Sequence, residues 1–252
     1  MFNKLIPLGV AAVSFIAWEA ALAVPQRFWA SFFVFAAAFF FGFSKLYNFH
    51  VRDKTCWLLA VPPFFLLFGF GVLSLFLTFA WLAHVVIIIG AVAVYFYLRN
   101  VYTFLFDITR YRTLSLERFS SYSSVVSFVC TAIAAYGFVN FLNTPVWYAA
   151  LAVAVAAFIL SYQFFWVNKI DEQHTLFAGL LVTILAVEFF WAISFFPITH
   201  FISGLALGIM YYVVINLTLL HFLDTLERKL TTTYLAIGSA CVLAILLSAK
   251  WL

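Results

Sequence analysis

The chain has 252 residues, of which 67% are hydrophobic and 9% are charged, and its mean hydropathy is +1.14. A globule of this length cannot hide so much apolar surface from water, so a soluble domain is excluded and lipid is the expected solvent. The net charge of +4 does not indicate nucleic-acid binding, because the basic residues are scattered between apolar runs. The composition predicts an all-α, polytopic integral membrane helix bundle.

Nine segments are apolar and long enough to cross a bilayer, which takes about 20 residues. In chain order they are 5–24, 28–47, 56–78, 81–98, 119–140, 144–166, 175–196, 198–222 and 232–250. Residues 56–98 are too long for one span and fit two spans joined by a tight turn near residues 78–82. The first segment resembles a secretory signal, but we interpret it as a transmembrane helix. No linker divides the chain, so residues 1–252 are expected to form a single transmembrane domain.

The chain has six prolines, and five of them bear on the limits and shape of the predicted spans. Pro25, Pro145 and Pro197 fall at predicted turns, where a missing N–H is least costly. Pro62 and Pro63 fall inside the third span, where they predict a kink or a late helix start.

The basic residues divide unevenly between the two sides of the membrane. The side that includes the N-terminus carries eleven: Lys4, Lys45, Arg52, Lys54, Arg99, Arg110, Arg112, Arg118, Lys169, Arg228 and Lys229. The other side carries two, Arg27 and Lys250. Because Lys and Arg concentrate on the cytoplasmic side, the N-terminus is predicted inside and the C-terminus outside. We expect a bacterial-type inner (plasma) membrane.

Spaced identities indicate an internal duplication. His84 and His200, Tyr95 and Tyr211, and Asn100 and Asn216 are each 116 positions apart, and Asp107 and Asp224 are 117 apart. The turn prolines Pro25 and Pro145 are 120 apart. We interpret spans 1–4 and 5–8 as a parallel four-helix duplication followed by one more helix, since an even number of spans keeps both copies in one orientation.

Two cytoplasmic segments, 105–119 and 222–235, mix charges with apolar residues at helical spacing. Their charged candidates are Asp107, Arg110, Arg112, Asp224, Arg228 and Lys229. Such segments are typical of interfacial helices that lie on anionic headgroups. The alternative is a docking surface for a partner.

The chain carries no Walker loop, GxGxxG, HExxH, GxSxG or CxxC motif. Asp171, Glu172 and His174 in "NKIDEQHT" are metal-ligand types, but charges that flank a helix explain them better, so no metal is predicted. The three dispersed cysteines, Cys56, Cys130 and Cys241, are interpreted as packing residues.

Four titratable groups fall within the outer half of the predicted spans: Glu19, Glu188, His84 and His200. A charge at the bilayer centre costs about 2.5–3.5 kcal/mol on insertion scales. We expect Glu188 to lie roughly 13 Å below the turn at Pro197, buried against other helices and neutral or hydrogen-bonded. The alternative is a proton or cation site.

Three functional classes remain. The first is a non-catalytic structural or interaction subunit that packs against other membrane proteins. The second is a small proton- or cation-coupled transporter or channel, and the third is a membrane enzyme acting on lipid. Transporters usually move about Gly-interrupted helices, whereas this chain has 10 Gly, 34 Phe and 8 Trp. We therefore favour the subunit, with the bilayer and other membrane-protein subunits as partners; the sequence names no cofactor or substrate.

Overall fold

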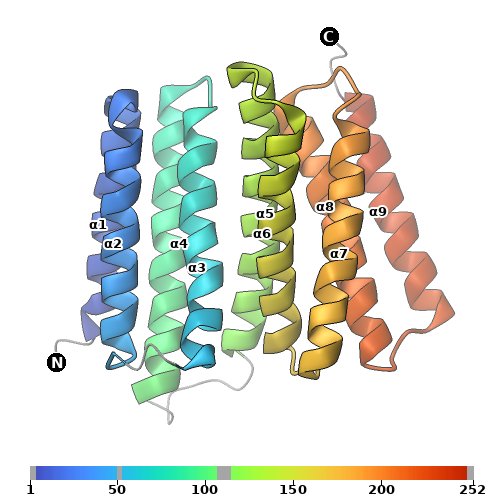
Figure 1. Ribbon diagram of the computed structural model, residues 1–252, viewed down its shortest axis with the longest axis horizontal. Coiled ribbons are helices and arrows are strands. Elements are labelled where there is room, and N and C mark those ends of the chain that lie inside the picture. The colour runs from blue at the N-terminus through green and yellow to red at the C-terminus, as the bar shows by residue number, and fades with distance from the viewer. Residues whose placement is uncertain (1–3, 50–52, 107–114, 249–252) are drawn as a thin grey trace. The chain divides into compact units, whose positions relative to one another are not determined.

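The computed structural model describes residues 4–49, 53–106 and 115–248. These residues form nine α-helices and one short 3-10 helix (Figure 1). The elements are α1 (Ile6–Ala23), η2 (Pro25–Arg27), α2 (Phe28–Leu46), α3 (Lys54–Leu75), α4 (Ala80–Phe106), α5 (Ser115–Leu142), α6 (Val146–Val167), α7 (Glu172–Ile193), α8 (His200–Phe222) and α9 (Arg228–Ser248). Each of the nine α-helices in the described residues is long and apolar enough to span a membrane, which confirms the predicted polytopic helix bundle.

The predicted turn within residues 56–98 is confirmed, because α3 ends at Leu75 and α4 begins at Ala80. The expected late start of α3 is wrong. The helix begins at Lys54, and its N-terminus is capped by the Asp53 carboxylate, which accepts a hydrogen bond of 3.0 Å from the Thr55 backbone N–H. It then continues through Pro62 and Pro63.

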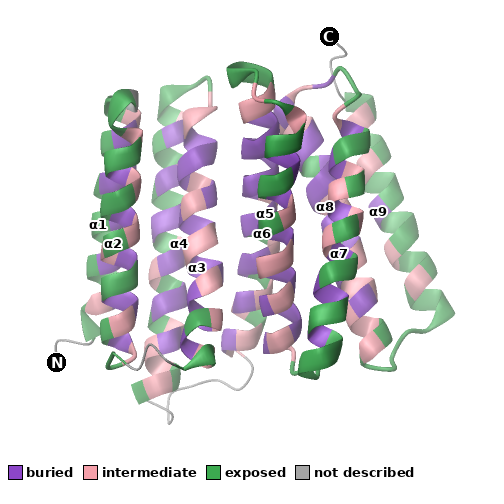
Figure 2. Cartoon of the chain, viewed as in Figure 1, coloured by how far each residue is buried: buried purple, intermediate pink, exposed green. Residues whose placement is uncertain are grey.

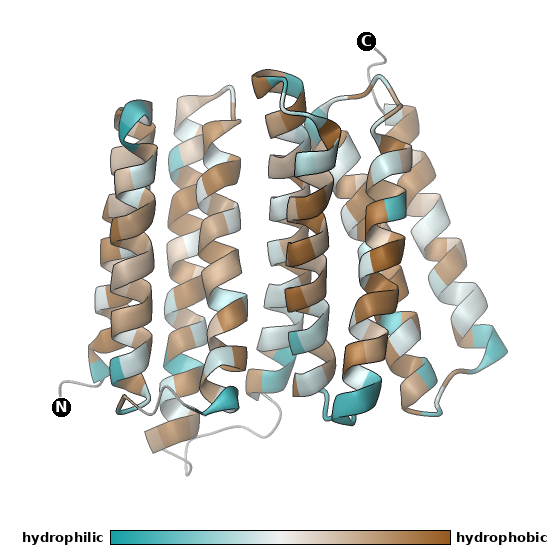
Figure 3. Cartoon of the chain, viewed as in Figure 1, coloured by the Kyte–Doolittle hydropathy of each residue, from teal (hydrophilic) through white to brown (hydrophobic). Residues whose placement is uncertain are grey.

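The chain divides into two compact units, residues 1–123 and 124–252, which we describe separately. The boundary falls inside α5, a continuous helix, so no linker marks it. Whether the two units act as a single domain stays a prediction. In each unit the hydrophilic residues concentrate near helix ends and turns, as expected for helices whose middle turns lie in lipid (Figure 3).

Aromatic rings fill much of the first unit, in which α1 packs against α2 and α4, and α3 packs against α4. Phe35, Phe39 and Phe43 recur every fourth residue on the buried face of α2. Trp18 of α1 is fully buried, 5.8 Å from Phe35 between ring centroids. Its ring lies against Gly71 of α3, where any side chain would collide with it. The high Phe content therefore serves internal packing as well as the lipid-facing surface.

The second unit packs α6 on α7, α7 on α8 and α8 on α9. Gly204 of α8 lies so close to Ile133 of α5 that a Cβ at position 204 would clash with the backbone of Ile133. The last helix, α9, is the least covered. Gly238, which faces Val213 of α8, is the one buried residue within its described length, and most of the helix is exposed (Figure 2).

One contact between corresponding helices recurs in the two units at nearly the same spacing. Trp18 of the first helix packs on Gly71 of the third, and Tyr136 of the fifth packs on Phe190 of the seventh, with centroids 4.5 Å apart. The first members of these pairs are 118 positions apart and the second members 119. These parallels support the duplication, which stays a prediction.

Candidate functional site

Two of the four titratable candidates meet in the first unit. The Nδ1 atom of His84, near the start of α4, lies 2.8 Å from Oε2 of Glu19, near the end of α1. The two residues are 65 positions apart, and the close packing of α1 on α4 brings them together. Such a pair can share or exchange a proton, because imidazole and carboxylate are natural acid–base partners.

His84 is the more exposed member of the pair. The His84 side chain is 51% exposed and that of Glu19 is 25% exposed. The second carboxylate oxygen of Glu19, Oε1, is buried and has no hydrogen-bond partner among the described residues. On the same helix, the indole Nε1 of Trp18 and the hydroxyl of Ser14 are also buried without a hydrogen-bond partner among the described residues. The exposed part of the pair is therefore mainly the imidazole of His84, while one carboxylate oxygen of Glu19 faces the protein interior.

His200 has different surroundings. It begins α8 and is buried, with its ring edge-on to Phe141 of α5 at 5.0 Å between centroids. The first and fourth helices thus meet through a carboxylate and a histidine in one unit, and the corresponding helices meet through an aromatic ring and a histidine in the other. That all four groups share one depth in the membrane stays a prediction.

The expectation that Glu188 is buried against other helices is wrong. Its side chain is exposed on α7, and no hydrogen bond or ion pair reaches it from the described residues. The buried face of α7 consists instead of small and apolar residues such as Ala178, Val182 and Ala186. Helix α7 also ends at Ile193, earlier than expected, so Glu188 lies about 8 Å of helix rise below that end rather than roughly 13 Å below the turn.

The predicted interfacial helix at 222–235 is also wrong. Phe222 ends α8, and Arg228 begins α9, so the segment is a turn followed by the first part of a spanning helix. The apolar residues after Lys229 continue the same helix. A continuous helix pairs the backbone N–H and C=O groups that lipid cannot hydrogen-bond. Asp224 lies in the turn with a φ of 53°. Of the other predicted segment, Asp107, Arg110 and Arg112 lie outside the described residues.

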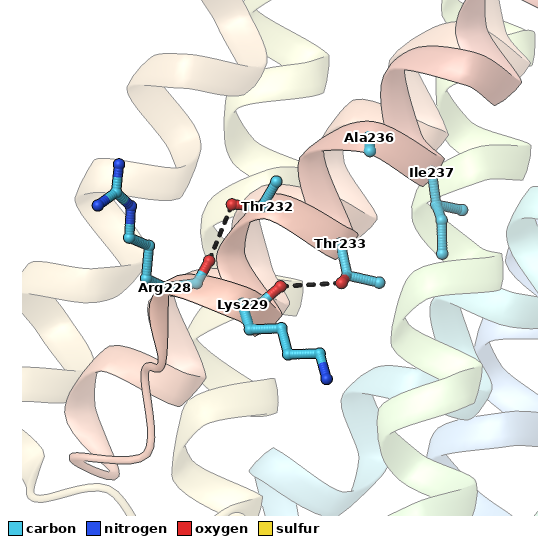
Figure 4. A pocket seen from close by; sticks show the side chains of 6 residues that line it. All are labelled: Arg228, Lys229, Thr232, Thr233, Ala236 and Ile237. Carbon is cyan, nitrogen blue, oxygen red and sulfur yellow. Dashed lines mark hydrogen bonds between the residues drawn. The ribbon is translucent and has the colours of Figure 1, made fainter.

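Arg228 and Lys229 line a shallow hollow of about 670 Å³ at the start of α9 (Figure 4). The hydroxyls of Thr232 and Thr233 also lie there, but each donates to a carbonyl one turn earlier, at 2.9 and 2.8 Å. The charged groups that line this hollow are therefore those of Arg228 and Lys229.

Asp171 and His174 have a local role. The Asp171 carboxylate accepts a hydrogen bond of 3.3 Å from the Gln173 backbone N–H and caps α7. The Nδ1 atom of His174 lies 3.6 Å from the same carboxylate. Among the described residues no group of three potential metal-binding side chains comes together.

Sequence reasoning missed a buried polar stripe on α5. Ser120, Ser124, Ser127 and Thr131 are all buried and recur at spacings of four, three and four residues. The Ser124 hydroxyl donates to Oε1 of Gln163 on α6 at 2.7 Å, and both side chains are fully buried. The helical spacing of these hydroxyls was the available signal. Such interhelical hydrogen bonds join helices in lipid.

The comparison with known families gives a match. The model of a family described as "Protein of unknown function (DUF5656)" covers residues 52–248, which is most of the chain. The chain belongs to this family. The DUF5656 match runs from the start of α3 to the end of α9, and thus includes His84, Glu188 and His200, whereas Glu19 lies before it. No curated protein and no solved structure matches the chain.

Proposed function

We propose that this DUF5656 protein is a non-catalytic subunit of a membrane assembly that docks on other transmembrane helices through α7. The observation that carries the proposal is the exposed carboxyl group of Glu188, set within an otherwise apolar helix face. Such a group in a spanning segment ordinarily faces protein or a water-filled cavity.

The contrast with Glu19 supports this reading. Both residues lie within five positions of the end of a spanning helix, but Glu19 has His84 at 2.8 Å, whereas Glu188 has no partner within the described chain. Protonation removes most of the cost of a charge in lipid, about 2.5–3.5 kcal/mol on insertion scales. The protonated carboxyl group still has a hydrogen-bond donor and an acceptor, and hydrocarbon offers no partner for either. A partner helix satisfies both.

The exposure of α9 supports the same function. Within its described length this helix has one buried residue, Gly238, so most of its surface away from α8 is open to lipid or to other helices. The proposal includes the orientation predicted from the basic residues, with the N-terminus in the cytoplasm of a bacterial-type inner membrane.

Mass measurement of the purified protein in mild detergent or nanodiscs tests the proposal. We expect an assembly heavier than the 28.6 kDa chain, and we expect Glu188→Leu to dissociate it while Glu188→Gln preserves it. Leu151→Ala is the matched control, because Leu151 is exposed five residues from the start of the adjacent helix α6. A chain that stays monomeric and without partners under all these conditions contradicts the proposal.

The Glu19–His84 pair favours a second candidate, a proton-coupled transporter. In that case, proteoliposomes carrying an internal pH dye should show proton flux that Glu19→Gln and His84→Gln both abolish. Flux equal to that of empty liposomes excludes this candidate and leaves the pair as a link between α1 and α4.

A further inference from the structure

The exposed face of α7 has the spacing of a helix-pairing seam. Phe177, Leu181, Ile184, Glu188 and Trp191, which we call the α7 seam, follow one another at intervals of four, three, four and three residues. All five side chains are exposed, and exposed positions recur along α7 in Figure 2. A repeat of 3.5 residues keeps one stripe facing a partner helix along its whole length in a left-handed pair.

Glu188 is the one polar member of the α7 seam, and its side chain leans away from the nearer end of the helix. It lies five residues before Ile193, about 8 Å of helix rise from the nearer end of α7. The Cα–Cβ bonds of a helix tilt toward its N-terminus, so this side chain leans away from that end and toward the middle of the span. The carboxyl group therefore needs a hydrogen-bonding partner at its own depth.

We infer that the partner is a second copy of this chain, paired through the α7 seam with the two Glu188 side chains in contact. This inference rests on the proposed function and names its partner. A neutral carboxylic acid carries one O–H donor and one carbonyl acceptor, so two identical groups form two reciprocal hydrogen bonds. Two-fold symmetry about the membrane normal places identical residues at equal depth and opposite each other.

A second copy also supplies the rest of the interface. Ile184 and Trp191, which flank Glu188, meet the same apolar residues in the partner, and a single polar residue in such a seam fixes the register of the pair. A different protein would need both an apolar stripe of the same period and a hydrogen-bonding group at the depth of Glu188. The self-complementarity of the carboxyl group and of its symmetric surroundings is what selects the second copy.

Disulfide trapping tests the geometry directly. In a background in which Cys56, Cys130 and Cys241 are replaced by Ala, Ile184→Cys is introduced into the α7 seam. Leu151→Cys on α6 is the control, since Leu151 is exposed to a similar degree, 60% against 56%, but lies outside the seam. Mild oxidation in native membranes should convert the seam variant, but not the control, to a species of twice the chain mass.

Self-association in detergent, measured by sedimentation or by energy transfer between labelled chains, tests the role of the carboxyl group. Glu188→Gln should associate as the wild type does, because two amides also form reciprocal hydrogen bonds. Glu188→Leu should associate roughly ten- to thirty-fold more weakly, the loss of two intramembrane hydrogen bonds.

Equal cross-linking of both cysteine variants, or unchanged self-association of Glu188→Leu, overturns the inference. A stoichiometric complex with a different protein, lost in Glu188→Leu, also overturns the second copy as partner but leaves the proposed function intact. A chain that stays monomeric and binds no partner overturns both this inference and the proposed function.

Discussion

The Tyr97 hydroxyl on α4 donates a hydrogen bond of 3.0 Å to the backbone carbonyl oxygen of Leu59 on α3. Pro63 stands four residues after Leu59 and has no N–H, so this carbonyl lacks its helical donor. Tyr97 is fully buried and takes the place of the missing donor. A carbonyl without a donor is costly in lipid, so α4 stabilises the proline-containing stretch of α3.

Replacing Tyr97 by Phe should lower the free energy of unfolding by about 0.5–2 kcal/mol, since it leaves the Leu59 carbonyl without a donor but keeps the ring. Equilibrium unfolding in mixed micelles measures the change. Tyr95→Phe is the control, because Tyr95 lies on the same helix and is only partly buried. An equal loss in both variants would contradict a specific role for the Tyr97 hydroxyl.

The same contact predicts coupling between Tyr97 and Pro63. Pro63→Ala restores an N–H that can reach the Leu59 carbonyl within α3. In that background Tyr97→Phe should cost clearly less than in the wild type. A double-mutant cycle measures the difference, and strictly additive losses would show that the two residues do not serve the same carbonyl.

Gly71 should tolerate no side chain. A Cβ there meets the ring of Trp18, which is fully buried and packed against Phe35, so Gly71→Ala should destabilise the first unit by about 1–3 kcal/mol. Gly9→Ala is the matched control, since a Cβ at that helical position meets nothing within 4 Å. It should be neutral or stabilising, by up to about 1 kcal/mol. Thermal unfolding of both variants checks the prediction, and Trp18→Leu should rescue Gly71→Ala.

Glu19 and His84 should be energetically coupled. Either Glu19→Leu or His84→Leu breaks the 2.8 Å contact and leaves the other polar side chain without it. The double variant removes both polar groups, so it should lose less stability than the sum of the single variants, with a coupling of about 0.5–1.5 kcal/mol. A coupling near zero would mean that solvent at the exposed His84 side replaces the contact.

Reporter fusions should place the two termini on opposite sides of the membrane. The eleven-to-two division of basic residues predicts that a reporter at Lys4 is cytoplasmic and that one after residue 252 is external. Paired phosphatase and fluorescent-protein fusions give complementary signals at each site. Signals from the same side at both termini would contradict an odd number of spans.

The sequence by itself determined the spans and their approximate limits. A spanning helix is specified locally, by the length of an apolar run and by the charges and turn residues that end it. For this reason the nine predicted segments agree with the helices of the described residues, and the turn near residues 78–82 was found. The same local logic failed for 222–235, where charges marked the start of a spanning helix rather than a separate interfacial one.

Only the tertiary structure decided which polar groups meet. Depth in the membrane follows from position along a helix, but the direction of a side chain follows from the helix's rotation about its axis. Helix α7 is apolar on all sides, so its hydrophobic pattern does not indicate which face packs. Close packing of Ala178 and Ala186 turned Glu188 outward, whereas the packing of α1 on α4 brought Glu19 to His84. Shape complementarity between helices sets these rotations in lipid, where the hydrophobic effect gives no preference between faces.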